Sequence, residues 1–218
     1  MIRSMTGFVT KRIFLAGPKE LAINIRSLNF KYLDIHISRV PWGLEELEKV
    51  IYETVIKKIK RGRLDITISL SQDNINKPLS VKKLKIKKAF REALEELLEF
   101  KELQGSLIKK DIKTITSALK KRSQFFLKYS KRIAQKKPES AKDIFEEVSL
   151  INFYLGHLDK ILDKEKGELG KILDFLSQEL LRETNTVLAK VKDRQFSLEA
   201  VYFKEEIDRL RELAQNIE

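Results

Sequence analysis

The stretch Leu64-Asp-Ile-Thr-Ile-Ser-Leu70 alternates apolar and polar side chains at every position. A period of two predicts a β-strand that buries one face and exposes the other. The same alternation occurs in residues 20–27 and again in residues 33–38. Residues 5–15 are the expected hairpin partner of the first of these, because Gly17-Pro18 breaks the chain between them. The four segments together predict one small sheet.

A helix is predicted between the third strand and the fourth. It begins at Pro41-Trp42-Gly43, and apolar side chains recur at helical spacing from Leu44 to Ile59. Arg61-Gly62-Arg63 then supplies the cations and the glycine that helix C-termini favour. The order β-β-β-α-β predicts a small α+β domain, which we assign to residues 1–78.

The chain changes character after the turn-rich stretch Gln72–Pro78. Ser80 is suited to cap a helical segment, because its side chain can accept a hydrogen bond from a backbone N–H of the first turn. Gly105 is expected to interrupt this segment, and Pro138 to end it. We assign residues 79–138 to a basic helical middle region.

The last part of the chain is also predicted to be helical. Ser140 begins one helix, and two more follow in residues 168–190 and 196–217. Their apolar side chains recur at helical spacing, as in helices that bury one face. We therefore expect an α+β fold in which the small sheet domain is followed by long antiparallel helices, with a C-terminal domain at residues 139–218.

Composition narrows the class of protein. Of the 218 residues, 42% are apolar, which argues against disorder, and the absence of cysteine excludes disulfides and thiolate zinc sites. No apolar run approaches the ~20 residues of a membrane-spanning helix, and the first residues do not resemble a signal peptide. We therefore expect a cytoplasmic protein without membrane contact.

The net charge of +12 favours a polyanionic partner, of which nucleic acid is the commonest.

Positive charge is concentrated in residues 107–137, where Lys and Arg are frequent and Asp111 is the one acid. A helix of one sign repels itself, by a few tenths of a kcal/mol per like-charged i, i+4 pair. RNA phosphate is one compensating partner, and Lys120, Lys121 and Arg122 are the predicted contacts. Acidic helices of the protein are the other, and the sequence leaves both open.

Residues 171–186 carry the arrangement that best suits chemistry. Glu179 and Glu183 lie four residues apart, so both carboxylates project from one side of a helix and can hold one divalent cation. Asp174 or a neighbouring subunit is a further expected ligand. Arg182 suits a phosphate, because its planar fork matches phosphate oxygens. The set suits metal-assisted hydrolysis of a phosphodiester, and an ordinary solvated helix face is the alternative.

Several other segments form a recognisable set. They are the opening Met1-Ile-Arg-Ser-Met-Thr-Gly-Phe8, Arg26-Ser-Leu-Asn-Phe-Lys-Tyr-Leu-Asp34, Arg61-Gly62-Arg63, Glu146-Glu147, His157, Leu173-Asp-Phe-Leu-Ser-Gln-Glu-Leu-Leu-Arg-Glu-Thr-Asn-Thr186, Lys190 and Gln215-Asn-Ile-Glu218. Together they resemble the YicC/YloC-type family of bacterial endoribonucleases. Phe30 replaces that family's usual His and Lys31 its Arg, so neither a base nor a bidentate clamp is assumed there. The middle of the chain is also shorter than is usual in the family.

The resemblance implies metal-dependent endonucleolytic cleavage of RNA by a homo-hexamer, with an RNA path toward a central opening. The expected cofactor is a divalent metal cation, Mg²⁺ or Mn²⁺. The predicted catalytic residues are Glu179, Arg182, Glu183 and His157. The predicted metal ligands are Asp174, Glu179 and Glu183.

Predicted RNA contacts lie at both ends of the chain. Near the start they are Arg3, Arg26, Asn29, Lys31 and Tyr32, which combine cations for phosphate with an aromatic ring for stacking. Asn185 and Lys190 are further predicted contacts. Both follow Glu183 on the predicted helix of residues 168–190.

The sequence is compatible with three functions. The first is an endoribonuclease that cleaves single-stranded or structured RNA as a homo-oligomer. The second is a non-catalytic RNA-binding adaptor that presents RNA to another nuclease, and the third is a structural oligomer whose basic helix packs on acidic helices of its neighbours. For the enzyme, a metal-free route is an alternative mechanism, in which His36 and His157 exchange the protons of the 2′-OH and the leaving oxygen.

Overall fold

The computed structural model describes residues 2–14, 20–41, 43–70, 83–136, 138–164 and 169–218. The chain divides into two compact units. The sheet unit comprises Arg3–Gly105 and Glu218, and the helical unit comprises Ile2 and Ser106–Ile217. The predicted break at Gly17-Pro18, the turn at Gln72–Pro78, the cap at Ser80 and the Trp42 of the first helix start lie outside the described residues.

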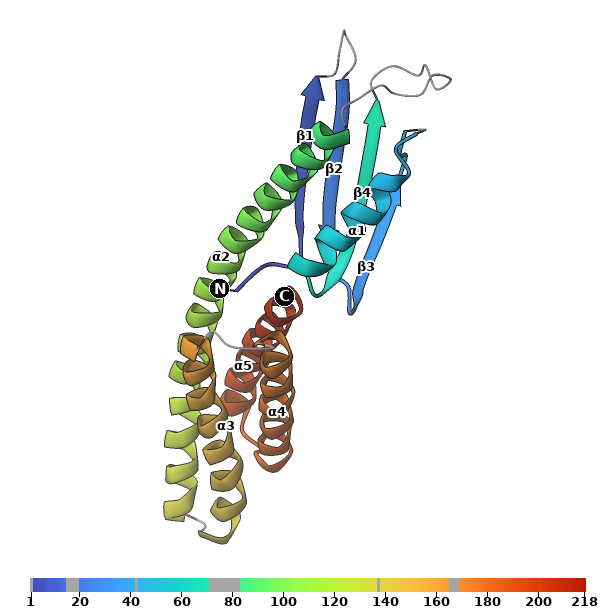
Figure 1. The fold of residues 1–218 in the computed structure, drawn as a ribbon. Helices are drawn as coiled ribbons and strands as arrows, with labels where there is room; N and C mark the ends of the chain where they lie inside the picture. Colours follow the sequence, from blue (N-terminus) through green and yellow to red (C-terminus); the bar gives the residue numbers. More distant parts are fainter. Residues whose placement is uncertain (1, 15–19, 42, 71–82, 137, 165–168) are drawn as a thin grey trace. The chain divides into compact units, whose positions relative to one another are not determined.

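The sheet unit holds a four-stranded sheet of the order β1-β2-β4-β3 (Figure 1). Its strands are β1 (Gly7–Phe14), β2 (Glu20–Leu28), β3 (Leu33–Ser38) and β4 (Gly62–Leu70). Strand β4 pairs antiparallel with β2 and parallel with β3, and helix α1 (Glu46–Lys58) makes the crossover that a parallel pair requires. The predicted order β-β-β-α-β and the α+β fold are confirmed.

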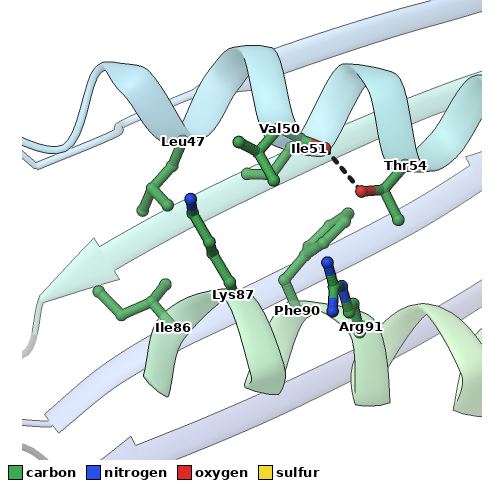
Figure 2. A pocket seen from close by; sticks show the side chains of 8 residues that line it. All are labelled: Leu47, Val50, Ile51, Thr54, Ile86, Lys87, Phe90 and Arg91. Carbon is green, nitrogen blue, oxygen red and sulfur yellow. Dashed lines mark hydrogen bonds between the residues drawn. The ribbon is translucent and has the colours of Figure 1, made fainter. Parts of the chain in front are cut away.

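One face of this sheet forms the core of the sheet unit. The alternating side chains that are buried there are Leu21, Ile23, Ile25, Leu64, Ile66 and Ile68. Helix α1 and the first part of α2 (Lys83–Lys136) cover this face in Figure 1. Figure 2 shows a small pocket where the two helices meet, lined by apolar side chains such as Ile51 and Phe90, with Lys87 and Arg91 beside them. The residues lining this pocket include none of the predicted site residues.

Helix α2 runs without a break from Lys83 to Lys136, so the prediction that Gly105 interrupts it is wrong. A glycine inside a helix costs about 1 kcal/mol relative to alanine. Burial of an apolar face along the helix outweighs that cost, and Gly105 is itself buried. The sequence pattern places boundaries at residues 78 and 138. The structure divides the two units at Gly105, because the first part of α2 packs on the sheet.

The helical unit contains the second part of α2 together with α3 (Pro138–Lys164), α4 (Leu169–Lys190) and α5 (Arg194–Gln215). Helix α2 ends before Pro138, as predicted, and this proline begins α3, where a residue without a backbone N–H is tolerated. The apolar stripes of these helices form one core, in which Leu155, Leu180 and Phe203 are buried. Of the helices described here, none combines the length and the apolarity that crossing a membrane demands.

A buried ion pair joins Lys101 of α2 to Glu218 within the sheet unit. The Lys101 side chain is fully buried, and its Nζ lies 2.7 Å from Glu218 Oε2. The backbone N–H of Lys60 donates to Glu218 Oε1 at 3.1 Å, and the backbone N–H of Glu218 donates to the carbonyl oxygen of Arg3 at 2.9 Å. Glu218 is therefore tied to three separate segments of the sheet unit.

Replacing Glu218 with Gln is expected to lower the free energy of unfolding by about 3 kcal/mol, because the buried Lys101 ammonium loses its compensating charge. Glu102→Gln is the matched control. Glu102 pairs with Arg3 at 2.6 Å, but both side chains are 32% exposed, and exposed pairs contribute less than about 1 kcal/mol. Denaturant unfolding followed by circular dichroism measures both variants. Equal, small losses would show that the buried pair contributes no more than a surface pair.

Candidate catalytic site

The acidic row predicted in residues 171–186 lies on α4. The apolar row beside it is buried, as predicted, and consists of Leu169, Leu173, Leu176, Leu180 and Val187. Glu183 is buried as well, with 7% of its surface exposed, and Glu179 is half-buried. Arg182 and Asn185 are exposed. Burial destabilises the charged form of a carboxyl group. The buried Glu183 therefore differs from ordinary acids, which lie on the surface.

Three further carboxylates act on Glu183, from α4 and from α3. Burial raises the pKa of Glu183 above its ordinary value, and the charges of Glu147, Glu179 and Glu146 raise it further, against the opposing effect of Arg182. These four acids, Glu146, Glu147, Glu179 and Glu183, are called the acidic cluster. Glu183 holds a proton at a higher pH than an ordinary carboxyl group, and such groups are suited to proton transfer.

Two cations contact the acidic cluster. Lys190 Nζ lies 2.7 Å from Glu147 Oε1, and the Glu147 side chain is 11% exposed. The other oxygen of that carboxylate, Oε2, is buried and has no hydrogen-bond partner among the residues that the structure describes. A buried oxygen without a partner is unfavourable, and a bound proton or cation would relieve this. Arg182 Nη1 lies 3.6 Å from Glu179 Oε2. The cluster thus combines buried acid with cations that suit a phosphate.

The three predicted metal ligands do not form a complete site in one chain. Asp174 is engaged elsewhere, because Arg211 Nε donates to its Oδ1 at 3.1 Å and Gln178 Nε2 donates to its Oδ2 at 2.8 Å. Asp174 precedes Glu179 by five residues, which places it on another side of the helix. Within the described ranges, no group of three or more His, Asp and Glu side chains is arranged to hold a metal ion.

His157 lies apart from the acidic cluster. It follows Glu147 by ten residues on α3, which is about 15 Å along the helix axis. Its exposed ring stacks on that of Phe153, with centroids 6.1 Å apart. Within this chain, the structure therefore does not bring His157 to the other predicted catalytic residues. His36 is exposed on β3.

Two of the three cations predicted at residues 120–122 pair with acids of other helices. Lys120 pairs with Asp159 of α3, and Arg122 Nη1 lies 2.7 Å from Glu199 Oε2 of α5. Lys121 is exposed. These pairs favour the explanation in which acidic helices of the protein compensate the basic segment, since opposite charges on packed helices attract.

The predicted RNA contacts near the start of the chain fall into two groups. Arg3 is held by Glu102, whose Oε1 accepts hydrogen bonds from Arg3 Nε at 2.9 Å and from Nη2 at 2.6 Å. The exposed members are Arg26, Asn29, Lys31 and Tyr32. A ligand can reach these exposed side chains without breaking an ion pair to Glu102, whereas contact with Arg3 would compete with that pair.

Glu146 and Glu147 are absent from the residues predicted as the site. The signal for Glu147 is its spacing, because it follows Ile144 by three residues and precedes Ile151 by four. An acid at this spacing occupies an apolar position of α3 and is expected to be buried. The structure buries it, with 8% of its surface exposed. Glu146 is exposed, and its spacing carries no comparable signal.

Comparison with known proteins agrees with the resemblance of the individual segments. The N-terminal region of the YicC-like endoribonucleases matches residues 2–149, and their C-terminal region matches residues 99–218. The chain is 24% identical over 296 aligned residues to the probable endoribonuclease YicC of Clostridioides difficile (strain 630), an alignment that covers 100% of each protein. It is 37% identical over 76 residues to the probable endoribonuclease YicC of Haemophilus influenzae, covering 35% of this chain and 26% of that protein. With both regions matched, the chain belongs to the YicC-like endoribonuclease family.

Proposed function

We propose that this chain is an endoribonuclease that cleaves single-stranded or structured RNA at internal phosphodiester bonds. Membership of the YicC-like family supports RNA as the substrate and cleavage as the reaction. The observation that carries the assignment of the site is the burial of Glu183 among other carboxylates, with Lys190 and Arg182 in contact with the same cluster.

The residues of the cluster have distinct proposed roles. Arg182 and Lys190 bind the phosphate and offset the negative charge that develops on its oxygens during cleavage. Glu147 positions Lys190 through their ion pair. Glu183 accepts or gives a proton at the reacting oxygens, a role that its raised pKa suits.

We also propose that Glu179 and Glu183 hold a divalent cation, Mg²⁺ or Mn²⁺, which supplies an activated water for hydrolysis when it is bound. Carboxylate oxygens are the donors that such hard cations prefer, and the buried, unpartnered Oε2 of Glu147 is a further oxygen of the same cluster. The described part of one chain holds no complete ligand set, so water, RNA or a neighbouring subunit supplies the rest. Assembly as a homo-hexamer and a cytoplasmic location are further predictions.

The incomplete ligand set is the observation that favours a second function, an RNA-binding adaptor that presents RNA to another nuclease. An adaptor has no use for carboxylates next to phosphate-binding cations, because without a bound cation they repel the phosphate. The acidic cluster therefore favours the enzyme over the adaptor.

Incubation of the purified protein with an end-labelled RNA in the presence of Mg²⁺ tests the proposal. We expect internal cuts that leave 5′-phosphate ends, as in metal-assisted hydrolysis. RNA that is bound and stays intact would support the adaptor. A protein that neither binds nor cuts RNA would contradict both functions and leave the structural oligomer.

A further inference from the structure

The face of the sheet that points away from the core carries one row of residues that crosses all four strands. Phe8 of β1 pairs with Arg26 of β2, and Arg26 pairs with Asp65 of β4. His36 of β3 pairs with the same Asp65. Side chains of directly paired residues project to the same face of a sheet, so these four residues lie side by side. They are called the open row.

Three of the four side chains in the open row are exposed. Phe8 exposes 58% of its surface, and Arg26 and His36 are exposed as well. The charge of Asp65 is balanced within the sheet, because Arg63 Nε donates to it at 2.9 Å. In the part of the chain that the structure describes, Arg26 forms no ion pair. The row thus presents an aromatic ring, an unpaired guanidinium and an imidazole.

The next row on the same face is polar and uncharged. Thr10 Oγ1 donates to Asn24 Oδ1 at 2.8 Å, and the hydroxyl oxygens of Ser38 and Thr67 lie 3.2 Å apart. Hydroxyl and amide groups can donate and accept hydrogen bonds, as the edges of nucleobases require. A ligand that stacks on the open row would therefore find hydrogen-bonding groups beside it.

The loop between β2 and β3, which begins a few residues after Arg26 in the chain, adds further aromatic surface. Phe30 and Tyr32 expose 44% and 65% of their surfaces. Lys31 Nζ lies 5.3 Å from the centroid of the Tyr32 ring. Proteins bind single-stranded nucleic acids with aromatic rings, on which bases stack, and with interspersed cations, which contact phosphates.

We propose that the open row binds unpaired bases of RNA, at a contact that rests on the proposed function but lies in the sheet unit, whereas the acidic cluster lies in the helical unit. An unpaired base stacks on the ring of Phe8, and Arg26 contacts the adjoining phosphate. A base inside a duplex has its faces covered by its neighbours, so the row selects single-stranded RNA. A protein partner would need a contiguous apolar surface, whereas here the ring of Phe8 lies among polar side chains.

The test compares Phe8→Leu with the matched control Phe14→Leu. Phe14 lies on the same strand and the same face, is 71% exposed, and pairs with Glu20 outside the open row. The probe is a fluorescent oligouridine of about 12 nucleotides, and its anisotropy is measured with the full chain in EDTA. We expect Phe8→Leu to weaken binding by about 5- to 150-fold, the loss of one stacked base. Phe14→Leu should bind like the wild type.

Two further variants separate stacking from charge and from folding. Phe8→Tyr keeps the ring and should bind like the wild type. Arg26→Gln should weaken binding and reduce the salt slope by about 0.7, because one phosphate contact to a single strand is lost. Phe8→Leu should leave the slope unchanged, since stacking involves no counterion.

The outcomes that overturn the inference are specific. One is wild-type affinity for both Phe8→Leu and Arg26→Gln. Another is an equal loss for Phe8→Leu on an abasic oligomer of the same length, which has no base to stack. If the wild-type protein binds neither oligouridine nor longer RNA, the proposed function itself is refuted. If the wild-type protein cleaves RNA but the open-row variants bind RNA like the wild type, only this inference is refuted and the proposed function stands.

Discussion

Replacement of Glu183 with Gln should lower the rate of RNA cleavage by between about 100- and 10,000-fold, the range that general acid–base catalysis contributes. Gln keeps the shape and the hydrogen-bonding capacity of Glu, but it cannot exchange a proton or supply the negative charge that a hard cation requires. Single-turnover cleavage of a labelled RNA measures the loss. Arg182→Lys, which keeps the charge and loses the planar fork, should reduce the rate less.

The stability of the Glu183→Gln protein provides the control for this result. The folded-state pKa of Glu183 lies above its ordinary value, because the side chain is buried beside other carboxylates. The folded state therefore binds more protons than the unfolded state, and wild-type stability falls as the pH rises from the unfolded pKa through the folded one. The Gln side chain removes this penalty. The variant should be at least as stable as the wild type near neutral pH, with a flatter pH dependence of the thermal midpoint.

RNA binding and assembly of the Glu183→Gln protein should survive, and binding can even tighten because an anion has left a phosphate site. Sedimentation and anisotropy measure the two properties. A variant that is folded but fails to assemble would show that the acidic cluster is a structural network at a subunit contact. The catalytic assignment would then move to His157, and His157→Ala would be the next variant.

Removal of divalent cations with EDTA should lower cleavage by at least about 100-fold, and Mg²⁺ or Mn²⁺ added in excess should restore it. The reason is that a carboxylate alone activates water only weakly, whereas a bound cation would lower the pKa of its water and so supply the nucleophile. The readout is the amount of product and the chemistry of its ends. Hydrolysis leaves a 5′-phosphate.

Full activity in EDTA would contradict the metal-dependent mechanism, and so would a 2′,3′-cyclic phosphate end. Either result would favour the route in which a histidine takes the 2′-OH proton. The variants His36→Ala and His157→Ala would then identify the histidine that acts. Under the metal-dependent mechanism, His36→Ala should cleave like the wild type.

Local side-chain patterns predicted the secondary structure well. The alternating residues from Leu64 to Leu70 lie in β4, and similar patterns predict the order of strands and helix in the sheet unit. Such patterns are readable because the side-chain period of a strand or a helix depends on neighbouring residues alone. Gly105 was the exception, because the continuity of a helix through a glycine depends on what packs against it.

Local sequence patterns predict the strands, the apolar stripes of the helices and the proximity of Glu179 to Glu183, since all of these depend on residues within a few positions of each other. Packing of distant segments sets the strand order β1-β2-β4-β3, the alignment of Phe8 with Arg26 and His36, and the electrostatic effect of Glu147 on Glu183. These features join residues that are far apart in the chain. Their free energy comes from burial, pairing and desolvation, which exist only once the segments have packed together.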